Sequence, residues 1–208
     1  NVNAQALLNG ADPTAFFDAA LESGRSDWER LLDRVIVELP PDEGHIGRTL
    51  KTTLGYILIN RDGPALQPGS RNYARSWIRD GAFSSTALLG MGFTEEPREF
   101  IRWFASFQEP DGRVPCCVDR RGADPVPEHD SHGQLIYTLN EYYRFTRDVG
   151  FLAEMWPAVV KAADYLERLR AQRTGDAYRQ PDKQAFFGLV PESISHEGYS
   201  SQPVHSYW

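Results

Sequence analysis

Residues 131–170, SHGQLIYTLNEYYRFTRDVGFLAEMWPAVVKAADYLERLR, hold two helical patterns separated by a very short link. Apolar residues recur every three to four positions on both sides of Val149-Gly150, as in amphipathic helices that bury one face. The pattern predicts helices at about 130–148 and 150–170, lying antiparallel as a hairpin. The expected buried stripes are Leu135, Leu139, Tyr142 and Thr146 in the first helix, and Leu152, Met155, Trp156, Val159, Ala163 and Leu166 in the second.

The same period extends towards the N-terminus. It predicts four more helices, at about 27–39, 46–60, 80–90 and 95–108. No segment shows the alternation expected of a half-buried strand. The sequence therefore predicts an all-α chain that forms a single domain over residues 1–208.

The predicted connections alternate between short and long. The long ones are 63–77, 109–130 and 171–208, and they are rich in Gly, Pro and polar residues. Helical hairpins joined in this way place their long loops at one end, and loops held on a rigid scaffold commonly build the functional site. We expect the site at that end.

Composition limits the class of ligand. A formal charge of −7 and a pI near 5.3 argue against nucleic acid, which requires clustered basic residues. No apolar run approaches the roughly 20 residues of a membrane helix, and the chain opens on Asn1 without a basic and apolar leader pattern. We expect a soluble protein without a membrane partner, and its compartment stays open.

The residues that could support other chemistry are few. Cys116 and Cys117 are adjacent, so a disulfide between them would close a strained ring, and as nucleophiles they would need an activating histidine. His196 and His205 are too sparsely accompanied for a zinc site. No glycine-rich phosphate loop is present. We expect neither a metal nor a cofactor.

Residues 72–83, NYARSWIRDGAF, gather a Trp, two Arg and an Asp at the predicted start of a helix. In one interpretation Asp80 caps the helix, Arg79 pairs with a nearby acid and Trp77 fills the core. In the other, the guanidinium and the carboxylate bind a polar ligand in fixed geometry. The residues alone leave both open.

This string resembles the Trp-x-Arg-Asp motif of the glucoamylase family and its relatives among the six-hairpin glycosidases, which include the glycogen-debranching glucosidases. The resemblance implies that Trp77, Arg79 and Asp80 bind the terminal glucose, with Tyr73 beside them.

A second polar segment, residues 127–134 (PEHDSHGQ), enters the helix predicted at 130–148. In the six-hairpin glycosidases a polar segment at this place contacts sugar, so the resemblance implies that Glu128, His129 and Asp130 bind substrate. The alternative is a capping cluster, in which Asp130 or the next residue satisfies the first N–H groups of the helix.

The resemblance also places the general acid in the loop after the last predicted helix. Glu192 is the candidate, Glu197 is a weaker one, and a carboxylate beyond Trp208 is an equal alternative.

The fold that the resemblance implies is an (α/α)6 toroid of helical hairpins, of which this chain resembles the N-terminal half, over about residues 27–208. The rest of the barrel would come from the same or another chain. The activity implied is hydrolysis of α-linked glucosides or related glycans by an inverting acid/base mechanism. The rival interpretation is a non-catalytic helical-hairpin scaffold that binds protein or carbohydrate, although no repeat pattern recurs between the hairpins.

Overall fold

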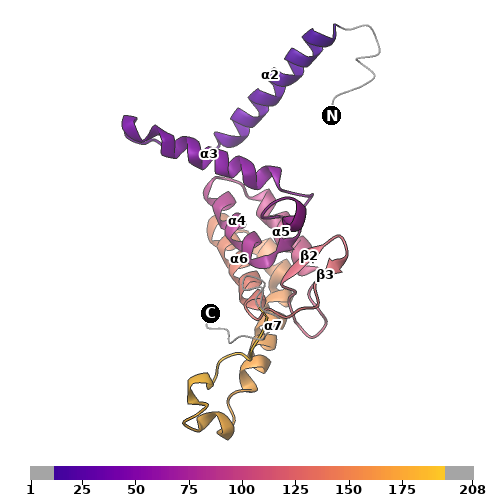
Figure 1. Cartoon of the computed structure of the whole chain (residues 1–208), viewed down its shortest axis with the longest axis vertical. Helices are drawn as coiled ribbons and strands as arrows, with labels where there is room; N and C mark the ends of the chain where they lie inside the picture. The colour runs from indigo at the N-terminus through magenta and orange to yellow at the C-terminus, as the bar shows by residue number, and fades with distance from the viewer. Residues whose placement is uncertain (1–11, 195–208) are drawn as a thin grey trace. The chain divides into compact units, whose positions relative to one another are not determined.

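The computed structural model describes residues 12–194, and helix makes up 61% of them (Figure 1). The all-α prediction is confirmed. The chain divides into two compact units, one ending at Gly55 and the other beginning at Tyr56. Within the described residues no helix is long and apolar enough to span a membrane. The closed toroid and the single domain of 1–208 stay predictions.

The first unit contains α2 (Pro13–Leu32), a short 3-10 turn (Pro41–Glu43) and most of α3 (Gly44–Ile59). The helix predicted at 27–39 is wrong at both ends. The Asp12 carboxylate starts α2 by accepting a hydrogen bond from the Thr14 N–H at 3.0 Å.

The backbone leaves α2 after Leu32, and the β-branched run Val35-Ile36-Val37 that follows disfavours helix. No residue of α2 is buried, but Phe17, Ala20 and Leu21 recur at helical spacing in its first half, and the prediction overlooked this pattern.

The second unit is built on four helices, α4 (Ile78–Gly90), α5 (Glu95–Ala105), α6 (Ser131–Thr146) and α7 (Val149–Ala171). Helix α6 packs against the other three (Figure 1). The largest fully buried side chains between them are aromatic: Phe93, Phe100, Phe104 and Phe151. The hairpin predicted around Val149-Gly150 is confirmed.

The buried stripe of α6 is as predicted at Leu135, Leu139 and Tyr142, but that of α7 is partly wrong. Trp156 is 55% exposed and Ala163 is exposed. The residues that α7 buries are Phe151, Met155, Ala162 and Leu169. Trp156 and Ala163 come directly after the buried residues Met155 and Ala162. At these places the predicted stripe therefore lies about one residue away from the face that α7 buries.

A small antiparallel sheet joins the two long loops, which corrects the expectation of no strand. Its order is β1 (Ser76–Trp77), β2 (Cys117–Asp119) and β3 (Gly122–Ala123), and Trp77 lies opposite Cys117. Strands of two or three residues are too short to show alternation. The sheet fastens loop 109–130 to the residues that lead into α4.

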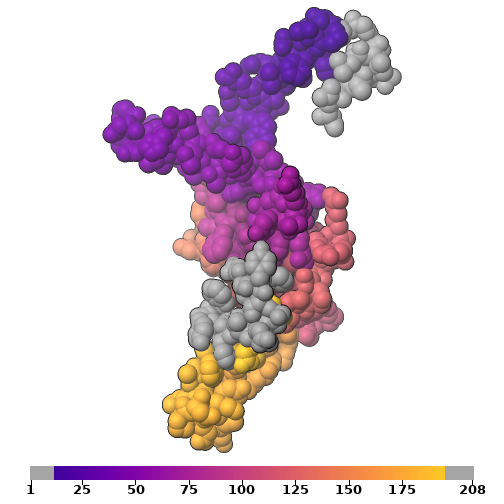
Figure 2. All heavy atoms as spheres, in the orientation of Figure 1, coloured from indigo at the N-terminus to yellow at the C-terminus, as the bar shows by residue number. Residues whose placement is uncertain are grey.

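The chain after α7 forms two 3-10 turns, Asp176–Arg179 and Gln184–Phe186. Coloured orange to yellow, this segment extends past the end of α7 (Figure 1), and Figure 2 shows it in the same colours as spheres. It then returns towards the helices, as the contacts of Glu192 below describe.

Candidate active site

The candidate site begins where β1 passes into α4. The Ile78 N–H donates to the Cys116 carbonyl at 3.0 Å, and Trp77 occupies the N-cap position. The helix starts two residues before the predicted Asp80, so Asp80 lies in the first turn and does not cap it. A carboxylate there is stabilised by the helix dipole. Trp77 is half-buried, which places it outside the core.

Arg79 connects two carboxylates from the segment before α6. Its Nε donates to Asp130 Oδ2 at 2.7 Å and its terminal nitrogen donates to Glu128 Oε2 at 3.1 Å. The three side chains are 18%, 8% and 4% exposed, respectively. We call Arg79, Glu128 and Asp130 the Arg79 cluster. It holds a fixed guanidinium at the adjoining N-terminal ends of α4 and α6.

The ion pair with Arg79 shows that the Asp130 side chain does not cap α6. This residue is the N-cap of α6, yet in the described structure its side chain makes no capping hydrogen bond. Its carboxylate accepts from Arg79 instead. Asp130 therefore orients the guanidinium, and only its backbone carbonyl serves the helix, by accepting from the Gln134 N–H at 2.9 Å.

A cavity of about 440 Å³ opens beside the cluster. It is lined by Phe83, Asp130, Gly133, Gln134, Tyr137 and Leu166. Phe83 is 62% exposed, and the Tyr137 hydroxyl lies 3.3 Å from the Thr86 hydroxyl. Of the predicted site residues, Asp130 lines this cavity, whereas the half-buried Trp77, Arg79 and Asp80 do not.

Aromatic residues flank the cluster on the β1 side. The rings of Tyr73 and Trp77 are 6.2 Å apart between centroids, and Tyr73 is 57% exposed. The Arg75 guanidinium lies 5.3 Å from the Trp77 ring centroid. Flat apolar faces with polar tips at such a place can stack against a sugar ring.

Sequence reasoning missed a second ion-pair network. Arg75 contacts Asp124 at 2.5 Å and Asp119 at 3.1 Å, and so braces the small sheet. Hydrogen bonds from Arg121 lower the pKa of Asp119 to about 2. Arg75 is the other arginine of the string at 72–83 and could have been singled out there. The two aspartates lie in loop 109–130, where no periodic pattern marks them.

Glu192 lies near the cluster. Arg173 contacts the Glu192 carboxylate at 2.7 Å, and the Glu192 backbone lies close to the His129 ring. Burial lowers the pKa of His129, and the charge of Arg173 adds to this effect. The structure thus brings Arg79, Glu128, His129, Asp130 and Glu192 to one end of the second unit. Glu197 lies outside the described residues.

His132 is a buried histidine for which the sequence analysis predicted no role. Its Nδ1 accepts a hydrogen bond from the Val114 N–H at 3.0 Å, and its ring lies 4.6 Å from that of Tyr165. Burial lowers its pKa to about 4, helped by His129. A neutral His132 therefore fastens the long loop to α6 and α7.

The described part of the chain gives little support for metal-dependent catalysis or for a cysteine nucleophile. No group of three or more His, Cys, Asp or Glu residues there could hold a metal ion. Cys116 and Cys117 are buried and unbridged. A hydrogen bond to Cys117, together with burial, raises the pKa of the Cys116 thiol, which opposes formation of a nucleophilic thiolate.

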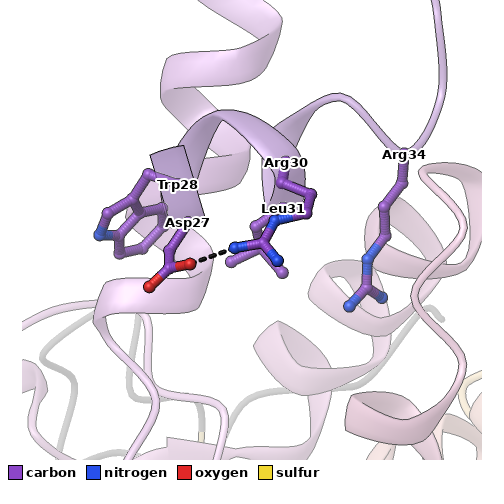
Figure 3. A pocket seen from close by; sticks show the side chains of 5 residues that line it. All are labelled: Asp27, Trp28, Arg30, Leu31 and Arg34. Atoms are coloured by element: carbon purple, nitrogen blue, oxygen red, sulfur yellow. Dashed lines mark hydrogen bonds and ion pairs between the residues drawn. The ribbon is translucent and has the colours of Figure 1, made fainter. Parts of the chain in front are cut away.

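The first unit carries a separate cavity of about 470 Å³ (Figure 3). It is lined by Asp27, Trp28, Arg30, Leu31 and Arg34, which lie on the last turns of α2 and just after it. Asp27 and Arg30 form an ion pair. No residue of the predicted sugar site belongs to it.

Comparison with known proteins gives one distant likeness. No protein-family model matches the chain. A protein of Methanocaldococcus jannaschii named "Uncharacterized glycosyl hydrolase MJ1610" is 29% identical over 126 residues, which cover 57% of this chain. The match covers 20% of that protein, so the chain corresponds to about a fifth of the length of the curated relative it matches. The chain is thus similar to part of a protein named as a glycosyl hydrolase.

Proposed function

We propose that the protein is a glycoside hydrolase that acts on α-linked glucosides or related glycans by an inverting acid/base mechanism. The observation that carries the proposal is the Arg79 cluster, in which two nearly buried carboxylates orient a guanidinium beside an open cavity. The likeness to a protein named as a glycosyl hydrolase supports the reaction class.

The cluster suits the recognition of a neutral sugar. A guanidinium donates in a fixed planar fork and carboxylates accept, so together they match hydroxyl groups that both donate and accept. Asp130 lines the cavity, and Asp80 lies in the same first turn as Arg79. In the proposed complex these groups bind adjacent hydroxyls, while Trp77 and Tyr73 offer aromatic faces to the ring.

The rest of the cluster and its neighbour have supporting roles in this proposal. Glu128 is 4% exposed in its side chain, so it acts mainly by orienting Arg79. His129 is buried, follows Glu128 and precedes Asp130 in the sequence, and lies close to the Glu192 backbone. In this proposal both residues position the sugar-binding groups without contacting the sugar themselves.

Inverting hydrolysis needs a proton donor and a base roughly 6.5 to 9.5 Å apart, on opposite faces of the sugar. Glu192 remains the candidate donor within the described residues, with Glu197 and a carboxylate beyond Trp208 as alternatives. The base would come from the remainder of the (α/α)6 barrel, in the same or another chain. No cofactor is needed for this chemistry.

The test is turnover by the full-length protein on a panel of maltose, isomaltose, trehalose and aryl α-glucosides. The proposal expects release of glucose from at least one of them, with the β-anomer formed first if the mechanism inverts. Detection of the initial anomer by NMR distinguishes inversion from retention. Tight binding of glycans without turnover of any would instead support the non-catalytic scaffold.

A further inference from the structure

Arg75 and Trp77 flank a buried serine and contact one another. The Ser76 hydroxyl donates to the Leu66 carbonyl at 2.7 Å, so this side chain points into the protein. Successive side chains of an extended chain point to opposite faces, which turns the neighbours of Ser76 away from it. Those neighbours meet, since the Arg75 guanidinium carbon lies 5.3 Å from the Trp77 ring centroid. A cation over an aromatic face attracts the ring, and this contact restrains the indole.

Two aspartates from loop 109–130 fix the position of the Arg75 guanidinium. A terminal nitrogen of Arg75 donates to Asp124 Oδ2 at 2.5 Å, and its Nε lies 3.1 Å from Asp119 Oδ2. The Arg75 side chain is 21% exposed, and both carboxylates are less exposed than this. Solvent and salt screen such a partly buried ion pair less than a pair on the surface. We call Arg75, Asp119 and Asp124 the Arg75 brace.

Backbone groups of the same loop orient the two carboxylates of the brace. The Asp124 N–H donates to the Cys117 carbonyl at 2.9 Å, and Asp124 Oδ1 accepts from the Val126 N–H at 2.9 Å. Asp119 Oδ1 accepts from the Arg121 N–H at 2.8 Å. Backbone donors therefore hold each carboxylate in place in addition to its ion pair with the guanidinium.

The orientation of the Trp77 ring depends on few contacts. Trp77 is half-buried, so the core does not enclose its indole. Among the described residues, its aromatic and cation–π contacts are with Tyr73, at 6.2 Å between ring centroids, and with Arg75. Because Tyr73 is 57% exposed, Arg75 is the partner that is firmly held. Trp77 is also the N-cap of α4, whose first turn carries Arg79.

We infer that Arg75 is a positioning residue of the sugar site, which sets the orientation of the Trp77 indole for stacking against substrate and does not contact substrate itself. A side chain that must be immobilised on binding lowers the affinity, so a ring fixed in advance binds a sugar more tightly. The inference rests on the proposed function for its kinetic consequence, and on the contacts alone for its structural one.

The structural consequence is tested by fluorine NMR of the full-length protein labelled with fluorotryptophan. The resonance that Trp77→Phe removes is assigned to Trp77. Arg75→Ala should shift or broaden this resonance, because the indole loses its cation. Arg75→Lys keeps the charge but not the planar fork that pairs with two carboxylates, so it should change the resonance less. An unchanged Trp77 resonance in Arg75→Ala overturns the inference.

Arg102→Ala is the matched control for this experiment. Arg102 also pairs with a carboxylate, that of Glu154 at 2.6 Å, and its guanidinium carbon also lies near a ring centroid, 5.1 Å from that of Phe151. Its removal should leave the Trp77 resonance unchanged. If Arg102→Ala changes that resonance as much as Arg75→Ala does, the effect is not specific to the brace and the inference fails.

The kinetic consequence is tested with a double-mutant cycle on Arg75 and Trp77. Arg75→Ala should raise KM by about three- to tenfold at nearly constant kcat, since it loosens a binding group and leaves the reacting groups in place. In a Trp77→Ala background the same change should have little further effect on KM, because Arg75 acts through the indole. Additive effects of the two changes overturn the inference, and so does an unchanged KM with a lowered melting temperature. If the wild-type protein turns over no glucoside, the proposed function fails while the Trp77 resonance still decides the positioning role.

Discussion

At the scale of single residues, His132 shows how burial sets the charge of a group. Its ring is 1% exposed and its Nδ1 accepts the Val114 N–H, an arrangement that favours the neutral form. Its pKa is lowered to about 4, from an ordinary value of 6.5. The unfolded chain therefore binds a proton as the pH falls through 6.5, whereas the folded chain resists until about pH 4.

The free energy of unfolding should consequently fall between pH 6.5 and pH 4, by about 3 kcal/mol from this residue. His132→Asn keeps an acceptor for Val114 but cannot titrate, so its loss of stability over this window should be smaller by that amount. Urea unfolding at pH 7 and at pH 4 measures the free energy of unfolding of the wild type and of His132→Asn. His45→Asn, at an exposed position, is the control and should follow the wild type. If the wild type and His132→Asn lose the same free energy of unfolding between pH 7 and pH 4, the role assigned to burial is refuted.

At the scale of elements, α4 and α5 approach one another at Gly81. A Cβ placed there would overlap the Phe100 ring, which is fully buried. Gly81→Ala should therefore lower the free energy of unfolding by about 1 to 3 kcal/mol, despite the better helix propensity of alanine. Gly90→Ala is the matched control, because no atom lies within 4 Å of a Cβ at that end of α4. Thermal unfolding of the two variants measures the difference, and equal melting temperatures would show that Phe100 moves aside at little cost.

The elements also show what the sequence could and could not predict. Helices α4 to α7 were predictable because each buries a stripe of apolar residues at helical spacing. The first half of α2 carries the same kind of spacing at Phe17, Ala20 and Leu21, which the prediction overlooked, and the helix buries none of these residues. The strands β1, β2 and β3 depend on pairing between distant loops, and single-sequence periodicity does not report such pairing.

The same limit applies to the site. Arg79 and Asp130 could each be singled out by local sequence and resemblance, but their ion pair spans 51 positions. Arg173 lies in a polar stretch with no motif, and its burial follows from the turn that returns to Glu192. Long-range contacts of this kind appear only in the folded chain.

At the scale of the whole molecule, the second unit exposes aromatic side chains that a closed domain would cover. Phe83 and Tyr137 line the cavity beside Asp130, and Phe145 lies exposed on α6. Exposed apolar side chains that gather at one place, as Phe83 and Tyr137 do, can mark a surface where another element binds. They fit the proposal that further hairpins of an (α/α)6 toroid pack against this unit and supply the catalytic base.

The most direct test of the proposed sugar site is kcat/KM for the full-length protein and two arginine variants, measured on the glucoside it turns over best. Arg79→Ala should lower kcat/KM by roughly 10² or more, because a charged hydrogen-bond partner of the substrate is lost. Arg102→Ala removes an arginine that is paired with Glu154 at 2.6 Å on the outer surface, and it should retain wild-type kcat/KM. If Arg79→Ala instead keeps wild-type kcat/KM and only lowers the melting temperature, the Arg79 cluster is a structural ion pair and the proposed sugar site is wrong.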